Sequence, residues 1–366
     1  MKVKYRKLET IRELLEDLEV KNLSRYASLS SRSRGRIKEE SFDPVRTIYM
    51  QDRDRILHSE YFRRLKHKTQ VFLSATSDES YRTRLTHTLE VAQIARTIAR
   101  ALRVNEDLTE AIALGHDLGH TAFGHAGEEE LDQLIEEGFK HALQSLRVID
   151  ILEKPGGMNL SREVRDGIGK HSKGGKKLLP FDEPDCPLTL EGEIVRVCDS
   201  IAYINHDVDD AIHSGIMNLD QLPKSCVDTL GERHSQRISI MVYDIISHSI
   251  DKPHIHMSDS ILEETERLRN FLFSHVYVLP KIDRPSRKAA RILKELFEYF
   301  MATPDIPYKV LKKLERKGER KERIIIDYLA TITDHEALEI YVKIFGIKKD
   351  LKSLYRSILI PPLLNF

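Results

Sequence analysis

The sequence predicts an all-α fold, and three observations support that prediction. Apolar residues recur at the i, i+3, i+4 spacing of amphipathic helices through most of the 366-residue chain. No region reads as a convincing set of strands, and no internal repeat is visible. The sequence also lacks a Walker or GxGxxG phosphate loop, which would have placed a helix after a parallel strand. We therefore expect a mostly helical protein.

Composition narrows the class of protein. Lys and Arg (58) balance Asp and Glu (58), so the formal net charge is zero and no global field draws the chain to nucleic acid or membrane. Cys186, Cys198 and Cys226 form no CxxC pair, which favours reduced thiols in a reducing compartment. No apolar run approaches the roughly 20 residues that span a bilayer. We expect a soluble, cytoplasmic protein with no membrane partner.

Residues 1–45 are predicted to form an N-terminal helix and a flexible arm. Leu8–Leu18 carries apolar side chains at helical spacing, whereas Ser24–Arg36 is rich in Ser, Arg and Gly and has little to bury. The arginines Arg32, Arg34 and Arg36 suit contacts with phosphates of another molecule, although a solvated basic loop is the favoured explanation.

Residues 46–215 are predicted to form the core. Asp43-Pro44 is a start signal for the first of its helices, and the Gly/Lys/Pro-rich stretch Ser172–Pro187 is predicted to be a connection. The helices expected from apolar spacing are Thr47–Phe72, Val91–Leu102, Ile112–His120, Glu128–Glu137, Phe139–Leu152, Ser161–His171 and Leu190–His213.

Residues 216–366 are predicted to be a helical C-terminal extension, punctuated by Pro304, Pro307 and Pro361-Pro362. Within it, Lys309–Arg323 is strongly basic, which suits a phosphate or a partner chain but also a solvated helix. The expected helices are Gln236–Ser249, Ser260–Val276, Arg284–Met301, Arg320–Ile332 and Asp334–Phe345.

A cluster of histidines and carboxylates follows residue 111. If Ile112–His120 is one helix, His116, Asp117 and His120 share one side of it, and an imidazole beside a carboxylate suits a divalent metal. Histidines satisfied at an exposed helix end are the simpler alternative. That alternative leaves Gly119, Gly124 and Gly127 unexplained, since each weakens a helix and together they indicate a tight turn.

A second polar face lies on the predicted helix Leu190–His213. Asp199, Tyr203 and Asp207 recur every four residues beside an apolar stripe. Buried carboxylates need a cation, which a metal would supply, whereas a solvent-facing stripe needs none. His87 stands near the start of another predicted helix, where its side chain suits a metal shared between helices.

The order His87, His116-Asp117, Asp199 resembles the four metal ligands of the HD superfamily of metal-dependent phosphohydrolases. Longer strings are similar to its deoxyguanosine triphosphate triphosphohydrolase branch, and the likeness covers roughly residues 53–210. These strings are Arg53–Ser59, Phe62–Leu65, Lys68–Phe72, Arg84–His87, His116–His120, Phe123–Glu128, Ile201–Tyr203 and His206-Asp207.

The resemblance implies hydrolysis of dGTP or other deoxynucleoside triphosphates (dNTPs) to deoxynucleoside and inorganic triphosphate, by attack of water on the α-phosphorus. It further implies roles for single residues. His87, His116, Asp117 and Asp199 would hold Mn²⁺, Mg²⁺ or iron, and His125 would act as the acid–base group, with Glu128 orienting it and His120 supporting the phosphate. Arg84 would clamp phosphates, Gln70, Tyr203 and Asp207 would face the sugar, and Lys170 and His171 are weaker phosphate candidates.

Two positions depart from the family pattern. Ala142 stands where Asn is common and Ser200 where Glu is common, which affects the expected substrate preference rather than activity. Two alternatives stay open: an HD phosphohydrolase acting on nucleoside monophosphates or cyclic nucleotides, and a nucleotide sensor without catalysis.

The resemblance also predicts how the chain associates. It predicts a homo-oligomer with an activating dNTP at subunit contacts, formed by the arginine arm and the C-terminal helices. The local basic patches leave single-stranded nucleic acid open as a further ligand.

Overall fold

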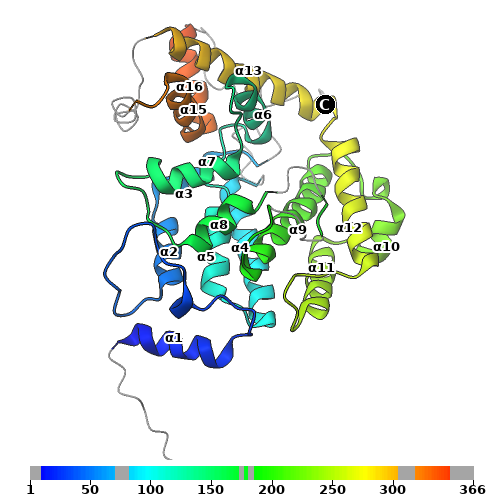
Figure 1. Ribbon diagram of the computed structural model, residues 1–366. Coiled ribbons are helices and arrows are strands. Elements are labelled where there is room, and N and C mark those ends of the chain that lie inside the picture. The colour runs from blue at the N-terminus through cyan, green and yellow to red at the C-terminus, as the bar shows by residue number, and fades with distance from the viewer. Residues whose placement is uncertain (1–9, 71–81, 173–176, 180–184, 304–317, 347–366) are drawn as a thin grey trace, which may run out of the picture.

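Helices form most of the described chain (Figure 1). The computed structural model describes residues 10–70, 82–172, 177–179, 185–303 and 318–346. Within these ranges, extended pairing is limited to two isolated β-bridges, Arg36 with Ser161 and Thr69 with Thr83. The predicted all-α fold is confirmed. No helix of the described residues is both long enough and apolar enough to cross a membrane.

Helix α5 (Glu106–Gly115) is the centre of the core. It packs against α2 (Ile48–Leu57), α4 (Arg84–Leu102), α8 (Arg162–Lys170) and α9 (Leu190–His213). All five residues from 111 to 115 are buried. The cluster of histidines and carboxylates therefore begins where the central helix of the core ends.

The predicted helix Ile112–His120 is wrong at its C-terminal end, because α5 stops at Gly115 and residues 116–119 form a turn. Gly119 explains the turn: a Cβ there would lie 2.1 Å from the backbone nitrogen of Ser145. The Ser145 hydroxyl accepts a hydrogen bond from the Gly119 N–H and donates one to the His116 carbonyl, both at 2.8 Å. Close approach of the chain to itself, rather than to a ligand, therefore requires this glycine.

The predicted helix Thr47–Phe72 is also divided. It forms α2, α3 (Glu60–Arg64) and a 3-10 turn over Leu65–His67. The division falls at Ser59, whose hydroxyl caps α3 by accepting from the Phe62 N–H at 3.1 Å. Residues 68–70 continue in non-helical backbone, and residues 71 and 72 lie outside the described ranges.

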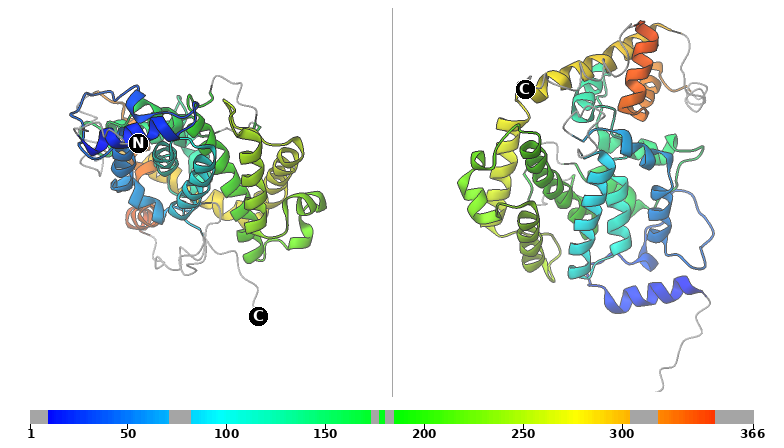
Figure 2. Two further views of the ribbon diagram at one scale, coloured as in Figure 1. Left: turned by 90° about the horizontal axis from the view of Figure 1, so that it is seen from below. Right: turned by 180° about the vertical axis from the view of Figure 1, so that it is seen from behind.

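The remaining helices surround the core in two groups, which Figures 1 and 2 show on different sides of it. One group lies beside α9. The other lies across the top, where α13 (Pro280–Ala302) packs against α6 (Gly124–Leu134), α15 (Lys321–Thr331) and α16 (Asp334–Phe345). The predicted basic stretch Lys309–Arg323 falls largely outside the described ranges. The first group consists of α10 (Lys224–Leu230), α11 (His234–Ser249), α12 (Asp259–Phe271) and the π-turn Leu272–Val276; the second consists of α6 (Gly124–Leu134), α13 (Pro280–Ala302), α15 (Lys321–Thr331) and α16 (Asp334–Phe345). Helix α7 (His141–Arg147), continued by the π-turn Val148–Leu152, lies between the core and the upper group.

The N-terminal arm differs from the flexible segment predicted. After α1 (Ile11–Asn22), buried carboxylates of the core bind its backbone. Glu191 accepts from the Ser28 N–H at 2.9 Å and Glu163 from the Arg34 N–H at 2.7 Å. Arg36, expected to reach outward, forms an ion pair with the fully buried Asp52. The arm has few apolar side chains to bury, but its amide groups find acceptors inside the protein.

Candidate active site

The four predicted metal ligands come from two helices and the turn after a third, and they meet inside the core. His87 lies in the first turn of α4, His116 and Asp117 follow α5 directly, and Asp199 lies midway along α9. His87 Nε2 is 3.1 Å from Asp199 Oδ1, and His116 Nε2 is 3.4 Å from Asp117 Oδ1 and 3.9 Å from Asp199 Oδ1. His87, His116 and Asp117 are buried, whereas the Asp199 side chain is 22% exposed, which leaves one open side.

The donor atoms of this cluster fit a divalent cation. His116 Nδ1 donates to the Ala113 carbonyl at 2.6 Å, so the lone pair lies on Nε2. Among the described residues, that buried Nε2 has no hydrogen-bond partner, a costly state that a bound metal would relieve. Burial is the largest influence on Asp199 and opposes its ionisation, but the hydrogen bond from His87 together with the charges of His87, His116 and His171 holds the pKa of that carboxyl below its usual value.

A second layer orients His87. His87 Nδ1 and His206 Nε2 are 2.9 Å apart, and His206 Nδ1 lies 2.7 Å from Asp207 Oδ1. The Tyr277 hydroxyl donates to Asp207 Oδ2. Such outer partners fix the tautomer and orientation of a metal-bound histidine. Asp207, predicted to face the sugar, is fully buried in this chain of contacts, and Tyr277 carried no signal in the sequence.

Arg84, predicted to clamp phosphates, is bound first to a metal-ligand candidate. Its Nη1 donates to Asp117 Oδ2 at 2.8 Å and its Nη2 to the Gln70 carbonyl at 3.3 Å. The side chain is only 1% exposed, and its Nε lacks a partner within the described residues. Arg84 therefore orients Asp117 and retains one free donor.

The predicted acid–base pair lies on α6. His125 Nδ1 is 3.4 Å from Glu128 Oε2, and the His125 side chain is 62% exposed. Glu128 is bound more tightly to His141, because its Oε1 accepts from both the backbone N–H and the ring Nδ1 of His141 at 2.8 Å. Burial disfavours the ionised Glu128, yet the charge of His141 holds the pKa of Glu128 well below its usual value.

His141 is the functional candidate that residue-by-residue prediction missed. His171 Nδ1 donates to the Ile168 carbonyl at 2.7 Å, so His171 Nε2 is an acceptor, 3.0 Å from His141 Nε2. His141 therefore donates from both ring nitrogens, and Glu128 raises its pKa despite burial, whereas burial lowers the pKa of His171 to about 3. The available signal was the Phe139-x-His141 string.

His120 lies between the candidate metal ligands and the predicted acid–base pair. Its ring stacks on that of His141, with centroids 4.0 Å apart, and its Nε2 lies 3.7 Å from Asp117 Oδ1. The His125 ring is 5.4 Å away, edge-on. Burial lowers the pKa of His120 well below its usual value, so the ring is neutral. In the described part of the chain its buried Nδ1 has no partner.

The other predicted substrate residues are divided between the cluster and its surroundings. Gln70 is buried beside Arg84, and its Oε1 has no hydrogen-bond partner among the described residues. Tyr203 lies one turn after Asp199 on α9, partly buried. His171 lies against the metal-ligand candidates, its ring centroid 4.9 Å from that of His116. Lys170 instead pairs with Asp166 at 2.8 Å and with the Cys186 carbonyl, outside the cluster.

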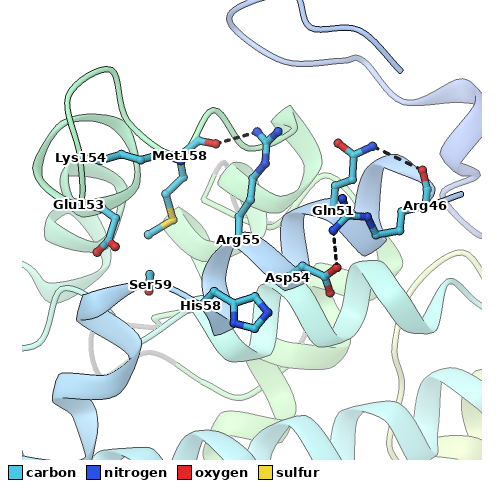
Figure 3. A pocket seen from close by; sticks show the side chains of 9 residues that line it. All are labelled: Arg46, Gln51, Asp54, Arg55, His58, Ser59, Glu153, Lys154 and Met158. Carbon is cyan, nitrogen blue, oxygen red and sulfur yellow. Dashed lines mark hydrogen bonds and ion pairs between the residues drawn. The ribbon is translucent and has the colours of Figure 1, made fainter. Parts of the chain in front are cut away.

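A separate cavity of about 420 Å³ lies between α2 and the loop that follows the π-turn Val148–Leu152 (Figure 3). Its two arginines are already paired: Arg55 donates to the Met158 carbonyl at 2.8 Å and Arg46 to Asp54 at 2.9 Å. None of the clustered histidines lines this cavity. The cavity is therefore separate from the cluster of histidines and carboxylates.

Comparison with known families identifies the region that carries these residues. The HD domain family matches residues 84–204, which include all four ligand candidates, and the phosphohydrolase-associated domain family matches residues 255–343. HD domains bind divalent metals, and the class of protein is therefore an HD-domain phosphohydrolase.

Relatives define the family more narrowly. Deoxyguanosinetriphosphate triphosphohydrolase-like protein from Caldanaerobacter subterraneus subsp. tengcongensis is 53% identical over 337 residues, covering 92% of this chain and 96% of the relative. The protein of the same name from Desulfatibacillum aliphaticivorans is 50% identical over 346 residues, covering 92% and 98%. The chain belongs to the family of deoxyguanosinetriphosphate triphosphohydrolase-like proteins.

Proposed function

We propose that the protein hydrolyses deoxynucleoside triphosphates, dGTP among them, to deoxynucleoside and inorganic triphosphate. One observation supports this most: His120 lies between the candidate metal ligands and the His125–Glu128 pair within a single cluster. The metal site can act on a phosphate while the pair supplies a proton. The names of the relatives agree with this substrate class.

The metal site is assigned to His87, His116, Asp117 and Asp199. Mn²⁺, Mg²⁺ or iron bound there would supply Lewis-acid chemistry at the α-phosphate and lower the pKa of a water molecule. His206 holds His87 and Arg84 holds Asp117 in the orientations that this binding needs. The open side at Asp199 is the direction from which a phosphate would arrive.

We assign the proton transfer to His125. Water attacks the α-phosphorus, the bond from that phosphorus to the 5′ oxygen breaks, and His125 protonates the departing 5′ oxygen. The exposed His125 ring can then recover a proton from solvent. Glu128, held ionised by His141, lies beside His125 Nδ1 and stabilises its charged form.

Substrate contacts are assigned to atoms without partners. The Arg84 Nε and the His120 Nδ1 are buried without hydrogen-bond partners within the described ranges, and both suit phosphate oxygens. The Gln70 Oε1 and Tyr203 suit the sugar, where a close aromatic ring would reject a 2′-hydroxyl.

We also propose a homo-oligomer with a regulating dNTP at a subunit contact. Helix α1 supports self-association, because Ile11, Leu14, Leu18 and Val20 are each at least 42% exposed although the helix is amphipathic. Light scattering after gel filtration, with and without mixed dNTPs, tests this: a monomer under all conditions would contradict it.

The test of the reaction is product analysis in H₂¹⁸O. Purified protein with Mn²⁺ receives each dNTP alone and then all four together, and products are resolved by ion exchange and mass spectrometry. We expect equal amounts of deoxynucleoside and intact triphosphate, with ¹⁸O in the triphosphate, because water attacks phosphorus. Release of phosphate or pyrophosphate, or turnover of monophosphates or cyclic nucleotides alone, would favour another HD phosphohydrolase; binding without turnover would indicate a sensor.

A further inference from the structure

The corner between α15 and α16 contacts two loops that lead into the cluster. Asp334, the first residue of α16, is nearly buried at 9% exposure. Its Oδ2 accepts from the Thr69 N–H at 3.0 Å and from the Thr69 hydroxyl, and its Oδ1 accepts from the Phe123 N–H at 2.9 Å. One carboxylate therefore binds two segments that are more than fifty residues apart in sequence.

Both segments end at residues of the candidate site. Thr69 precedes Gln70, whose carbonyl accepts from Arg84. Phe123 precedes Gly124 and His125, and the backbone is left-handed at Phe123 (φ 63°) and Gly124 (φ 58°). The left-handed conformation is unfavourable for a non-glycine residue, so a contact from outside the loop helps to hold Phe123 in it.

The two segments also meet each other and share a second link to α15. A Cβ on Gly124 would lie 2.9 Å from the Gln70 carbonyl oxygen. The buried Lys68 donates from Nζ to the His120 carbonyl and, at 2.7 Å, to the Ala330 carbonyl of α15. The positions of the two loops are therefore set jointly, from outside the HD core.

We propose that Asp334 is a positioning residue of the active site, acting through Thr69 and Phe123 to fix Gln70 and His125. The C-terminal helices thereby support the catalytic geometry although they supply no metal ligand. The kinetic part of this inference rests on the proposed function, whereas its structural part does not.

Asp244 offers a matched control. It is equally buried, at 8% exposure, and makes the same kind of contact: Oδ2 accepts from the Ser258 N–H at 2.8 Å and Oδ1 from the Ser258 hydroxyl at 2.7 Å. Of its partners, His248 lies in α11 and Ser258 directly precedes α12. Asp244→Asn and Asp334→Asn each place an amide NH₂ where two or three donors converge, so both lose stability.

The experiment compares these two variants with wild type. We expect similar losses in melting temperature and unchanged Mn²⁺ content, but a fall in kcat of about tenfold to a hundredfold only in Asp334→Asn, because the acid–base group is misplaced. Thr69→Val should lower kcat in the same direction, and Thr69→Ser, which keeps the hydroxyl, should restore it. Equal kcat in Asp334→Asn and Asp244→Asn would overturn the proposal.

Hydrogen exchange separates this inference from the proposed function. The amides of Thr69 and Phe123 should exchange faster in Asp334→Asn than in Asp244→Asn, whether or not the protein turns over dNTPs. Unchanged exchange at both amides would refute the positioning role. A wild-type protein that releases no triphosphate would refute the proposed reaction alone.

Discussion

The two halves of the cluster are supported in different ways. The proposed metal half, His87, His116, Asp117 and Asp199, is carried by α4, α9 and the turn after α5, all packed together within the HD core. The proposed acid–base half, His125 and Glu128, is carried by α6, which packs chiefly on α13 in the C-terminal group. Among the described residues, His116 Nε2 in the first half has no hydrogen-bond partner, whereas Glu128 in the second is bound by His141 through three contacts.

This difference indicates a division of labour. A metal site needs fixed, dry ligands with free lone pairs, and a rigid core supplies them. A proton-transfer group needs exchange with solvent. His125 is exposed, whereas its carboxylate partner Glu128 is held in place. Changes in the first half should therefore remove metal, whereas changes in the second should leave metal content intact.

The largest effect is expected from Asp199→Ala. Loss of this ligand should release the metal and lower turnover by at least about a thousandfold, because Lewis-acid stabilisation contributes several kcal/mol. Metal content by mass spectrometry and kcat are measured together. Asp209→Asn is the control, since Asp209 lies on the same helix but pairs with Arg237 at 3.1 Å. Full metal content in Asp199→Ala would remove Asp199 from the ligand set.

His125→Ala tests the second half. We expect kcat to fall by about a hundredfold to ten-thousandfold while metal content stays at the wild-type value. The kcat of Glu128→Gln should fall in the same range, since the amide cannot stabilise a charged His125. Glu129→Gln, an exposed neighbour on α6, should behave as wild type. Turnover of His125→Ala at the wild-type rate would contradict the acid–base assignment.

The difference between the two halves also explains which parts of the site could be predicted from the sequence. Spacing and the family resemblance pointed to His87, His116, Asp117 and Asp199, whose role as ligands stays a prediction. The core brings them together from α4, α9 and the turn after α5, and α9 has the predicted bounds Leu190–His213. Helix periodicity alone could not place the end of α5, which depends on contact between Gly119 and Ser145.

The missed residues share a cause. The bond from His141 to Glu128, that from Tyr277 to Asp207 and those from Asp334 to Thr69 and Phe123 join elements whose packing no local pattern encodes. Local patterns describe faces of single helices, whereas these contacts arise only when several elements meet. The arm shows the same limit, because its backbone is bound by the distant carboxylates Glu163 and Glu191.

A smaller effect is expected at His206, which links the metal half to its outer layer. His206→Asn should weaken metal affinity by about tenfold to a hundredfold, as outer partners of metal-bound histidines typically do. Metal titration by calorimetry measures it. Asp207→Asn and the double variant complete a cycle, and because the residues form one chain, their effects should fall short of additive. Strict additivity would mean that Asp207 does not act through His206.

The smallest effect concerns Lys68, which supports the acid–base half. Burial lowers the pKa of Lys68 to about 7, with Asp334 and Glu336 opposing that shift and Arg64 and Arg84 adding to it. The unfolded chain keeps the ordinary pKa of about 10.4, so between these values the unfolded state binds more protons. Stability from this group therefore rises with pH in that window, by about 1.4 kcal/mol per pH unit at most.

Denaturant unfolding at pH 7 and at pH 9 tests this sign. Lys68→Met lacks the titrating group, so its free energy of unfolding should gain less between the two pH values than that of wild type. Lys66→Met, which removes an exposed neighbouring lysine, should gain as much as wild type. Equal gains in all three proteins would show that Lys68 stays charged in the folded protein up to pH 9. That result would mean that the bonds from Lys68 to His120 and Ala330 hold the acid–base half equally well at both pH values.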